Sequence, residues 1–187
     1  MSSYKVGLAL DIFSKMKIAG IIVGVIALLG FGAFAYLGGF EEISLKVEEV
    51  GDVRLYGLTY IGTPQDEGLK QTFEKVEGLK QSNPSAVLHT IYMIEPAGKL
   101  DTMQVFVGLD RLENSDGGNW EEKVIFAKSA VVADLKFNKL VMPRPEKVKD
   151  RIKGFAKEEG LALQGVYIDR LIAEDHVQVI APIKSGN

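Results

Sequence analysis

The chain has 187 residues, a formal net charge of −3 at pH 7 and a sequence pI near 5.5. This charge balance gives no basic surface, so nucleic acid is not expected among its partners. The sequence holds no cysteine, which excludes disulfides, thiolate nucleophiles and Cys-ligated metal centres. The length is sufficient for one domain with its own core.

The N-terminal part contains an uncharged apolar run over residues 18–40. About 23 helical residues would span roughly 34 Å, against about 30 Å for the hydrocarbon core of a bilayer. We therefore expect residues 1–17 to be a short cytoplasmic N-terminus and residues 18–40 to be a transmembrane helix. Gly20, Gly24 and Ala27 share one face of that helix, a pattern that allows membrane helices to self-associate.

The charges before this run predict its orientation. Lys5, Lys15 and Lys17 precede it against a single Asp11. Because cytoplasmic flanks are enriched in Lys and Arg, we expect a single-pass protein of the cell inner membrane. Residues 41–187 would then be extracytoplasmic, in the periplasm.

A cleaved signal peptide is the alternative interpretation of the same run. Ala33-Phe34-Ala35 matches an A-x-A cleavage site. However, the region before the run is long for a signal peptide, and the apolar residues continue past these alanines. An uncleaved anchor is therefore favoured.

The next segments predict two strands and a helix. Residues 43–61 alternate between apolar and polar with a break at Gly51-Asp52, which is typical of strand, turn and strand. Thr63 offers a capping hydroxyl before Pro64, so a helix is expected to begin there and to end at Asn83-Pro84. Its apolar positions have helical spacing: Leu69, Phe73, Val76 and Leu79.

The remaining segments repeat this order. Residues 87–94 and 103–109 predict a hairpin, and a polar loop over residues 112–122 separates the two halves. The second half predicts a strand at 124–137, a helix after Pro143 and Pro145 that ends at Gly160, and a hairpin at 161–169 and 176–183. The chain thus predicts a duplicated βαββ domain of the α+β class over residues 41–187. Both helices would pack on one face of an antiparallel sheet, and the other face would bend around a groove.

Residues 43–184 resemble the GyrI-like family of effector-binding domains. The resemblance rests on four segments in this order: VRLYGLTYIG, HTIYMIEP, GVYIDR and VQVIAPI. It implies a small-molecule groove across the two repeats, lined by aromatic residues. The chain has no helix-turn-helix, so the transcriptional role of some members does not carry over.

The sequence departs from the family at two points. Members that bind cations or hydrolyse electrophiles place a glutamate just before the second-repeat tyrosine, whereas this chain has Gly165-Val166 before Tyr167. The family turn of the His-x-Gly type is replaced by residues 134–137. Without the buried anion, neither cation binding nor general-base catalysis is expected, so we do not expect an enzyme.

Five residues are candidates for ligand binding: Tyr56, Tyr92, Glu95, Trp120 and Tyr167. Tyr92 and Tyr167 hold equivalent places in the two halves and could sandwich a flat ligand. The alternative is that they fill the core with their hydroxyls at its edge. Glu95 could supply the missing charge.

Metal, haem and catalytic sites have little support. The two histidines, His89 and His176, fall inside predicted strands, and the acidic pairs are adjacent residues that point in different directions. We expect no catalytic residue, metal or cofactor.

Three functions therefore remain from the sequence. The first is a membrane-anchored, non-catalytic GyrI-like domain that binds a hydrophobic or amphipathic small molecule. The alternative is a structural or protein-interaction scaffold with a closed groove. The third is a hydrolase of small electrophiles.

Overall fold

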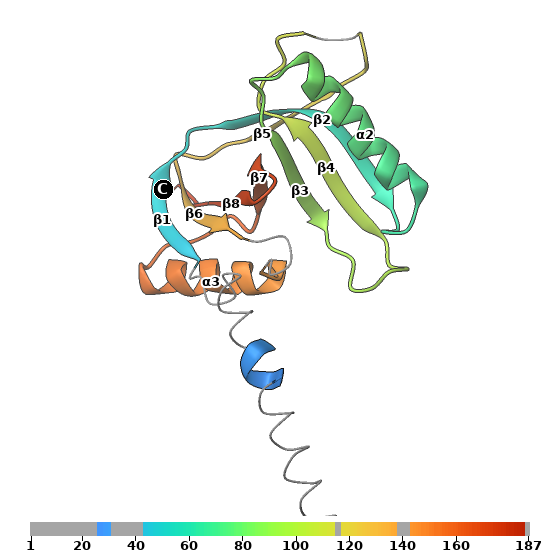
Figure 1. Cartoon of the computed structure of the whole chain (residues 1–187). Helices are drawn as coiled ribbons and strands as arrows, with labels where there is room; N and C mark the ends of the chain where they lie inside the picture. Colours follow the sequence, from blue (N-terminus) through green and yellow to red (C-terminus); the bar gives the residue numbers. More distant parts are fainter. Residues whose placement is uncertain (1–25, 31–42, 115–116, 138–142, 186–187) are drawn as a thin grey trace, which may run out of the picture. The chain divides into compact units, whose positions relative to one another are not determined.

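The structure is a computed structural model that describes residues 26–30, 43–114, 117–137 and 143–185. The described residues from 43 onward form one compact unit of the α+β class, with two helices and eight strands (Figure 1). All eight strands belong to a single sheet in which every neighbouring pair is antiparallel.

The predicted membrane localisation requires correction. In the part of the chain that the structure describes, no helix has the length and apolar character needed to cross a bilayer. Within the predicted span 18–40, the described residues are 26–30, and they are helical. The rest of the span, and all of residues 1–17, lie outside the described residues. That no described helix could cross a bilayer contradicts the single-pass inner-membrane assignment with a periplasmic domain. Helix self-association through Gly20 and Gly24 has no support.

Each half of the domain contains four strands and one helix. The first half consists of β1 (Ser44–Glu49), β2 (Val53–Gly62), α2 (Glu67–Ser82), β3 (Leu88–Ile94) and β4 (Met103–Leu109). The second half consists of β5 (Glu121–Ile125), β6 (Ser129–Lys136), α3 (Pro145–Glu158), β7 (Ile168–Ala173) and β8 (His176–Pro182). The strand predicted at 124–137 is therefore two strands, and the repeated unit is ββαββ rather than βαββ.

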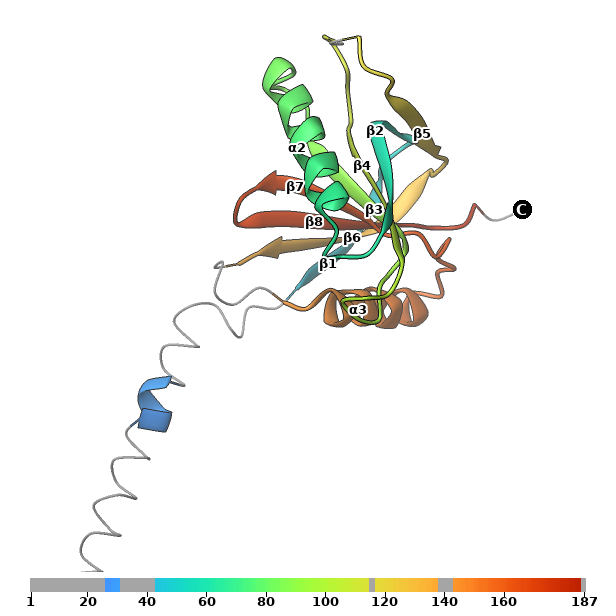
Figure 2. The ribbon, with the colours of Figure 1, turned by 90° about the vertical axis from the view of Figure 1, so that its right-hand side faces the viewer.

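The two halves exchange their edge strands. The strand order is β1-β6-β8-β7-β3-β4-β2-β5, so β1 pairs with β6 of the second half and β5 with β2 of the first. Figure 2 shows β7, β8, β6 and β1 side by side in that order. The connection between β1 and β2 is hydrogen-bonded to the connection between β5 and β6. Val50 N donates to Lys128 O at 3.2 Å, and Ala127 N donates to Asp52 Oδ1 at 3.1 Å. The halves meet where β3 pairs with β7.

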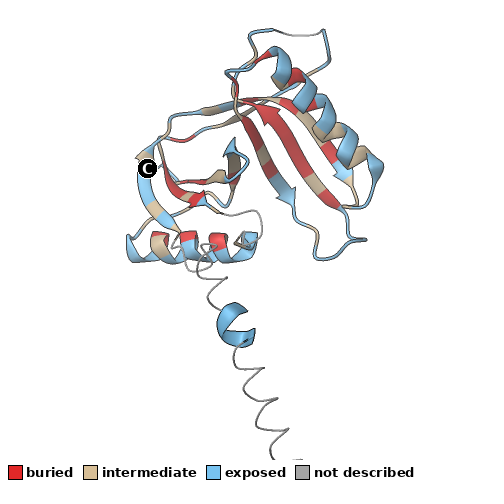
Figure 3. Ribbon diagram, in the orientation of Figure 1, coloured by how far each residue is buried: buried red, intermediate tan, exposed pale blue. Residues whose placement is uncertain are grey.

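The two helices cover the same face of the sheet, as the sequence predicts. The core under α2 includes Val76, Leu79 and Val105, and the core under α3 includes Ile152 and Val179. Figure 3 shows buried residues along the strands of the sheet, including β3 and β4. A third core fills the opposite face and joins the halves. Its buried members are Leu55, Ile91, Phe106, Ala130, Val132, Ile168 and Ile180. The groove predicted on that face is therefore wrong, because apolar side chains occupy its centre.

The helix ends differ in part from the prediction. α2 is capped by Asp66, whose carboxylate accepts from Gly68 N at 3.0 Å, and not by Thr63. α3 begins with Pro145 at its first turn, as expected. Gly160 follows its end with φ +67°, a left-handed conformation that favours glycine.

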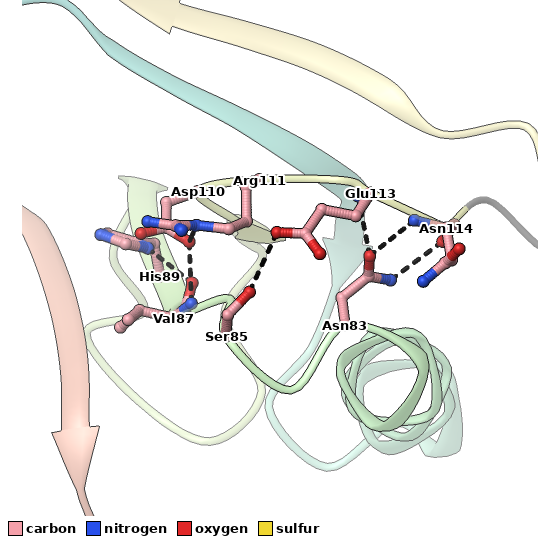
Figure 4. A network of polar contacts seen from close by, with 8 residues as sticks. All are labelled: Asn83, Ser85, Val87, His89, Asp110, Arg111, Glu113 and Asn114. Atoms are coloured by element: carbon pink, nitrogen blue, oxygen red, sulfur yellow. Dashed lines mark hydrogen bonds and ion pairs between the residues drawn. The ribbon is translucent and has the colours of Figure 1, made fainter.

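Asn83 ends α2 and anchors the loop that follows β4 (Figure 4). It is fully buried, and its amide nitrogen donates to Leu79 O and Asn114 O, both at 2.9 Å. Its oxygen accepts from the backbone N–H groups of Glu113 and Asn114, both at 2.8 Å. Both N–H donors and both oxygen lone pairs of this amide are thus used, so the buried polar group is well compensated.

Candidate functional site

The centre of the helix-bearing face lies between the two helices. α2 packs chiefly against β2 and β4, and α3 packs chiefly against β6. The paired strands β3 and β7 lie in the middle of the sheet order, between these regions. This strand pair is therefore the part of the helix-bearing face that a ligand could reach.

The register of β3 and β7 places five side chains on this face. Thr90 lies opposite Asp169, and Leu171 lies opposite the buried Leu88. Tyr92 and Tyr167 adjoin the last registered pair at the other end. We call Thr90, Tyr92, Tyr167, Asp169 and Leu171 the central face. Tyr92 and Leu171 are 38% and 37% exposed, so apolar surface remains open to solvent on both sides of the carboxylate.

Asp169 supplies a part-buried carboxylate. Burial raises the pKa of the Asp169 carboxyl above its usual range, and the Lys149 ammonium and the Thr90 hydroxyl offset part of this effect. The bond from Thr90 Oγ1 to Asp169 Oδ2 is long, at 3.5 Å. The chain lacks the family glutamate before Tyr167, yet it has a part-buried carboxylate on the same strand. The anion comes two residues after Tyr167, on the same side of the strand.

The two predicted tyrosines lie beside this carboxylate. Burial raises the pKa of the Tyr92 hydroxyl, and the negative charge of Asp169 raises it further. Burial also raises the pKa of Tyr167, which packs at the edge of the core under α3. Both phenols are thus neutral near pH 7. The structure brings Tyr92 and Tyr167 together at the junction of the halves.

Lys149 reaches the central face from α3. Its side chain is only 16% exposed, and its Nζ lies 5.2 Å from the centroid of the Tyr167 ring. The same ammonium forms an ion pair with Glu95, which directly follows β3. Burial lowers the pKa of Lys149, while the nearby Asp169 acts in the opposite direction. Glu95 therefore lies at the site, but its charge is paired with a residue of the other half.

The other two predicted residues lie elsewhere. Tyr60, not Tyr56, lies level with Tyr92 across the sheet, because both are paired with Val105 of β4. Tyr56 lies four residues from Tyr60 along β2. Tyr56 is therefore displaced from Tyr92 by about 13 Å along the strands and by about 10 Å across the sheet. Trp120 packs against the core under α2. Tyr56 and Trp120 are therefore not part of the central face.

The histidines are engaged within the domain. His89 is buried, and its Nδ1 donates to Val87 O at 2.9 Å. His176 Nε2 donates to Asp134 Oδ1 at 2.8 Å, on the strand pair β6 and β8. Within the described ranges, no group of three or more His, Cys, Asp or Glu side chains could hold a metal ion.

Sequence reasoning missed Asp169, Thr90 and Lys149. The period of two along β7 links Tyr167 to Asp169, so the spacing held a signal for the carboxylate. Lys149 directly follows Val148, which is buried under the sheet, so it borders the apolar stripe of α3. Thr90 lies opposite Asp169 only because β3 pairs with β7, and no local sequence pattern predicts that pairing.

No protein-family model matches the sequence, and no curated protein matches it. Solved structures do match. A hydrolase from Listeria innocua aligns with a TM-score of 0.53 at 8% identity, covering 76% of this chain and 93% of that chain. The C-terminal domain of EcmrR aligns with a TM-score of 0.54 at 14% identity, covering 77% of this chain and 99% of that domain. EcmrR in its complex with DNA aligns with a TM-score of 0.55 at 14% identity, covering 92% and 70%.

The chain has the fold of the EcmrR C-terminal domain. At these identities the likeness establishes the fold alone. It agrees with the GyrI-like architecture that the sequence motifs predict, and it leaves activity and ligand to the residues of the site itself.

Proposed function

We propose that the domain binds a small hydrophobic or amphipathic molecule on the central face and does not transform it. One observation carries the proposal. A part-buried carboxylate, Asp169, lies between two patches of exposed apolar surface, at Tyr92 and Leu171. Burying a carboxylate costs free energy, so a carboxylate at such a place is more easily explained by ligand binding than by stability.

The chemistry of the central face fits such a ligand. The rings of Tyr92 and Tyr167 offer flat apolar area, and rings of this kind stack with planar molecules. Thr90 and Asp169 offer hydrogen-bonding groups between the apolar patches, which would orient a ligand that has a polar group. The shared fold with the EcmrR C-terminal domain and the resemblance to the GyrI-like family support the same class of function.

A fluorescence titration of the full-length protein with neutral acridine tests the proposal. We expect a Kd in the micromolar range, or about −8 kcal/mol. Tyr92→Ala should weaken binding by about tenfold, since it removes a stacking surface. Tyr56→Ala is the matched control, because it removes a part-buried tyrosine from the same sheet outside the central face. It should leave the Kd unchanged.

Two outcomes would contradict the proposal. The first is no measurable binding of acridine to the parent protein. The second is an equal response to Tyr92→Ala and Tyr56→Ala. Either result would favour the scaffold role, in which this face serves the structure or a protein partner.

A further inference from the structure

Lys149 already occupies a position that a positively charged ligand would take. Its ammonium lies over the ring of Tyr167 at 5.2 Å, is ion-paired with Glu95 and is close enough to Asp169 to affect its pKa. An aromatic face together with carboxylates is the usual environment of a bound organic cation. Here the chain itself supplies that cation.

The fold holds Lys149 in this position. Val148 and Ile152, its neighbours on α3, are 3% and 0% exposed and anchor the helix on the sheet. With the helix fixed in this way, the ammonium reaches Glu95 on the other half through the conformation of its own side chain alone. Because the contact is intramolecular, a free cation must compete with a group at high effective concentration.

The charges on the described side chains point the same way. Asp169 and Glu95 carry two negative charges when ionised, and Lys149 neutralises one of them. With the ammonium in place, a ligand cation finds the Tyr167 ring occupied and meets a like charge. A neutral flat molecule can still use Tyr92 and the apolar patch at Leu171.

We propose that Lys149 is a tethered cation that fills the cation position of the central face and selects for ligands without positive charge. The inference rests on the proposed function and adds its charge specificity. Lys149 is thus a specificity-determining residue, acting by occupation of one part of the site.

The test compares two probes of the same shape, neutral acridine and the permanent cation N-methylacridinium. Both are titrated into the full-length protein and into the Lys149→Met variant, and the readout is the ratio of the two Kd values. In the parent, acridine should bind more tightly. In Lys149→Met, the ratio should shift by about tenfold in favour of the cation, as expected for a part-buried cation on an aromatic ring beside carboxylates.

Three further variants make the result specific. Lys147→Met removes an exposed lysine from the same helix and should keep the parent ratio. Lys149→Arg retains the charge and should also keep it. Adding Asp169→Asn to Lys149→Met should reduce the gain in cation binding, because one of the two carboxylates is then neutral. Lys149→Gln repeats the comparison if the methionine variant does not fold.

The outcomes separate the two proposals. If acridine binds and the Kd ratio is the same in the parent and in Lys149→Met or Lys149→Gln, the role of Lys149 is wrong and ligand binding stands. If neither probe binds any variant, both proposals fail. If Lys147→Met shifts the ratio as much as Lys149→Met, the effect is one of overall charge and the tethered cation is disproved.

Discussion

The Asp169 carboxylate destabilises the folded domain, but it gives the proposed binding site a charged group. Its carboxylate is part-buried near Tyr92, and the long bond from Thr90 at 3.5 Å compensates it poorly. Carboxylates with a raised pKa in a folded protein destabilise that protein at every pH at which they ionise. Proteins tend to keep such groups at functional sites.

Asp169→Asn should therefore stabilise the domain at neutral pH. Because burial raises the folded pKa of Asp169 above its unfolded value, the carboxylate disfavours the folded state above the folded pKa. This penalty fades as the pH falls toward the unfolded value. The stabilisation by the asparagine should shrink in the same interval, which urea unfolding of both proteins at several pH values would measure.

Asp134 provides a control of opposite sign. Its hydrogen bond from His176 lowers the pKa of the Asp134 carboxyl, so ionisation favours the folded state. Asp134→Asn should destabilise the domain near pH 7, and this loss should disappear as the pH falls through the folded pKa. A parallel response of both variants to pH would contradict the two assignments.

At the scale of the element, the end of α2 depends on one amide. Asn83 joins the last turn of the helix to the loop after β4, far along the chain. Side-chain capping of this kind satisfies carbonyls that a helix end would leave without partners. The loop in turn leads to β5, so the amide helps to place the strand that completes the first half.

Asn83→Ala should destabilise the domain by roughly 3 kcal/mol. The change removes four hydrogen bonds of a buried amide and leaves the backbone N–H groups of Glu113 and Asn114 without this acceptor in a part-buried place. Urea unfolding would measure the loss. Ser85→Ala removes the exposed bond to Glu113 at 3.1 Å in the same network and should cost less than about 0.5 kcal/mol. Equal losses of stability in the two variants would mean that burial does not determine the contribution of Asn83.

At the scale of the whole domain, the exchange of β1 and β5 ties the halves together. Each half completes its sheet with a strand from the other, and the third core is built from both. Neither half can keep its edge strand or this core by itself. The domain should therefore unfold as one cooperative unit.

Ile152→Ala tests this cooperativity. Ile152 of α3 is fully buried in the core of the second half, so its truncation should cost about 2–5 kcal/mol. Trp120 packs in the first half, and its fluorescence reports that half. The fluorescence midpoint should fall together with the midpoint from far-UV circular dichroism. A Trp120 transition that stays in place would show that the halves unfold independently.

Much of this architecture follows from local sequence patterns. Alternation predicted β2, β3, β4 and β8, and apolar spacing predicted α2 and α3, because both periods reflect a single buried face. The boundary between β5 and β6 was missed because residues 126–128, Phe-Ala-Lys, contain no glycine or proline. There the chain leaves one half and joins the other, and only tertiary pairing determines that change. Phe73 has the helical spacing of the apolar face of α2, and it is partly buried against the core under that helix.

The site was predictable to a smaller extent. Equivalent positions in the repeat pointed to Tyr92 and Tyr167, since their place depends on the order of elements. Lys149 and Glu95 come from different halves, and their ion pair exists only after the halves meet. The environment that raises the pKa of Asp169 is likewise built by β3 and α3. Patterns within one segment carry no information about such neighbours.

The exchanged strands also determine an order of events during synthesis. β1 leaves the ribosome first, yet its partner β6 follows only after the whole first half and β5. Until then, the nascent chain carries a strand with no neighbour and a first half without its outer strand. Such edges are where chains associate wrongly. The charged residues of β1, Lys46, Glu48 and Glu49, would keep this waiting strand apart from other nascent copies.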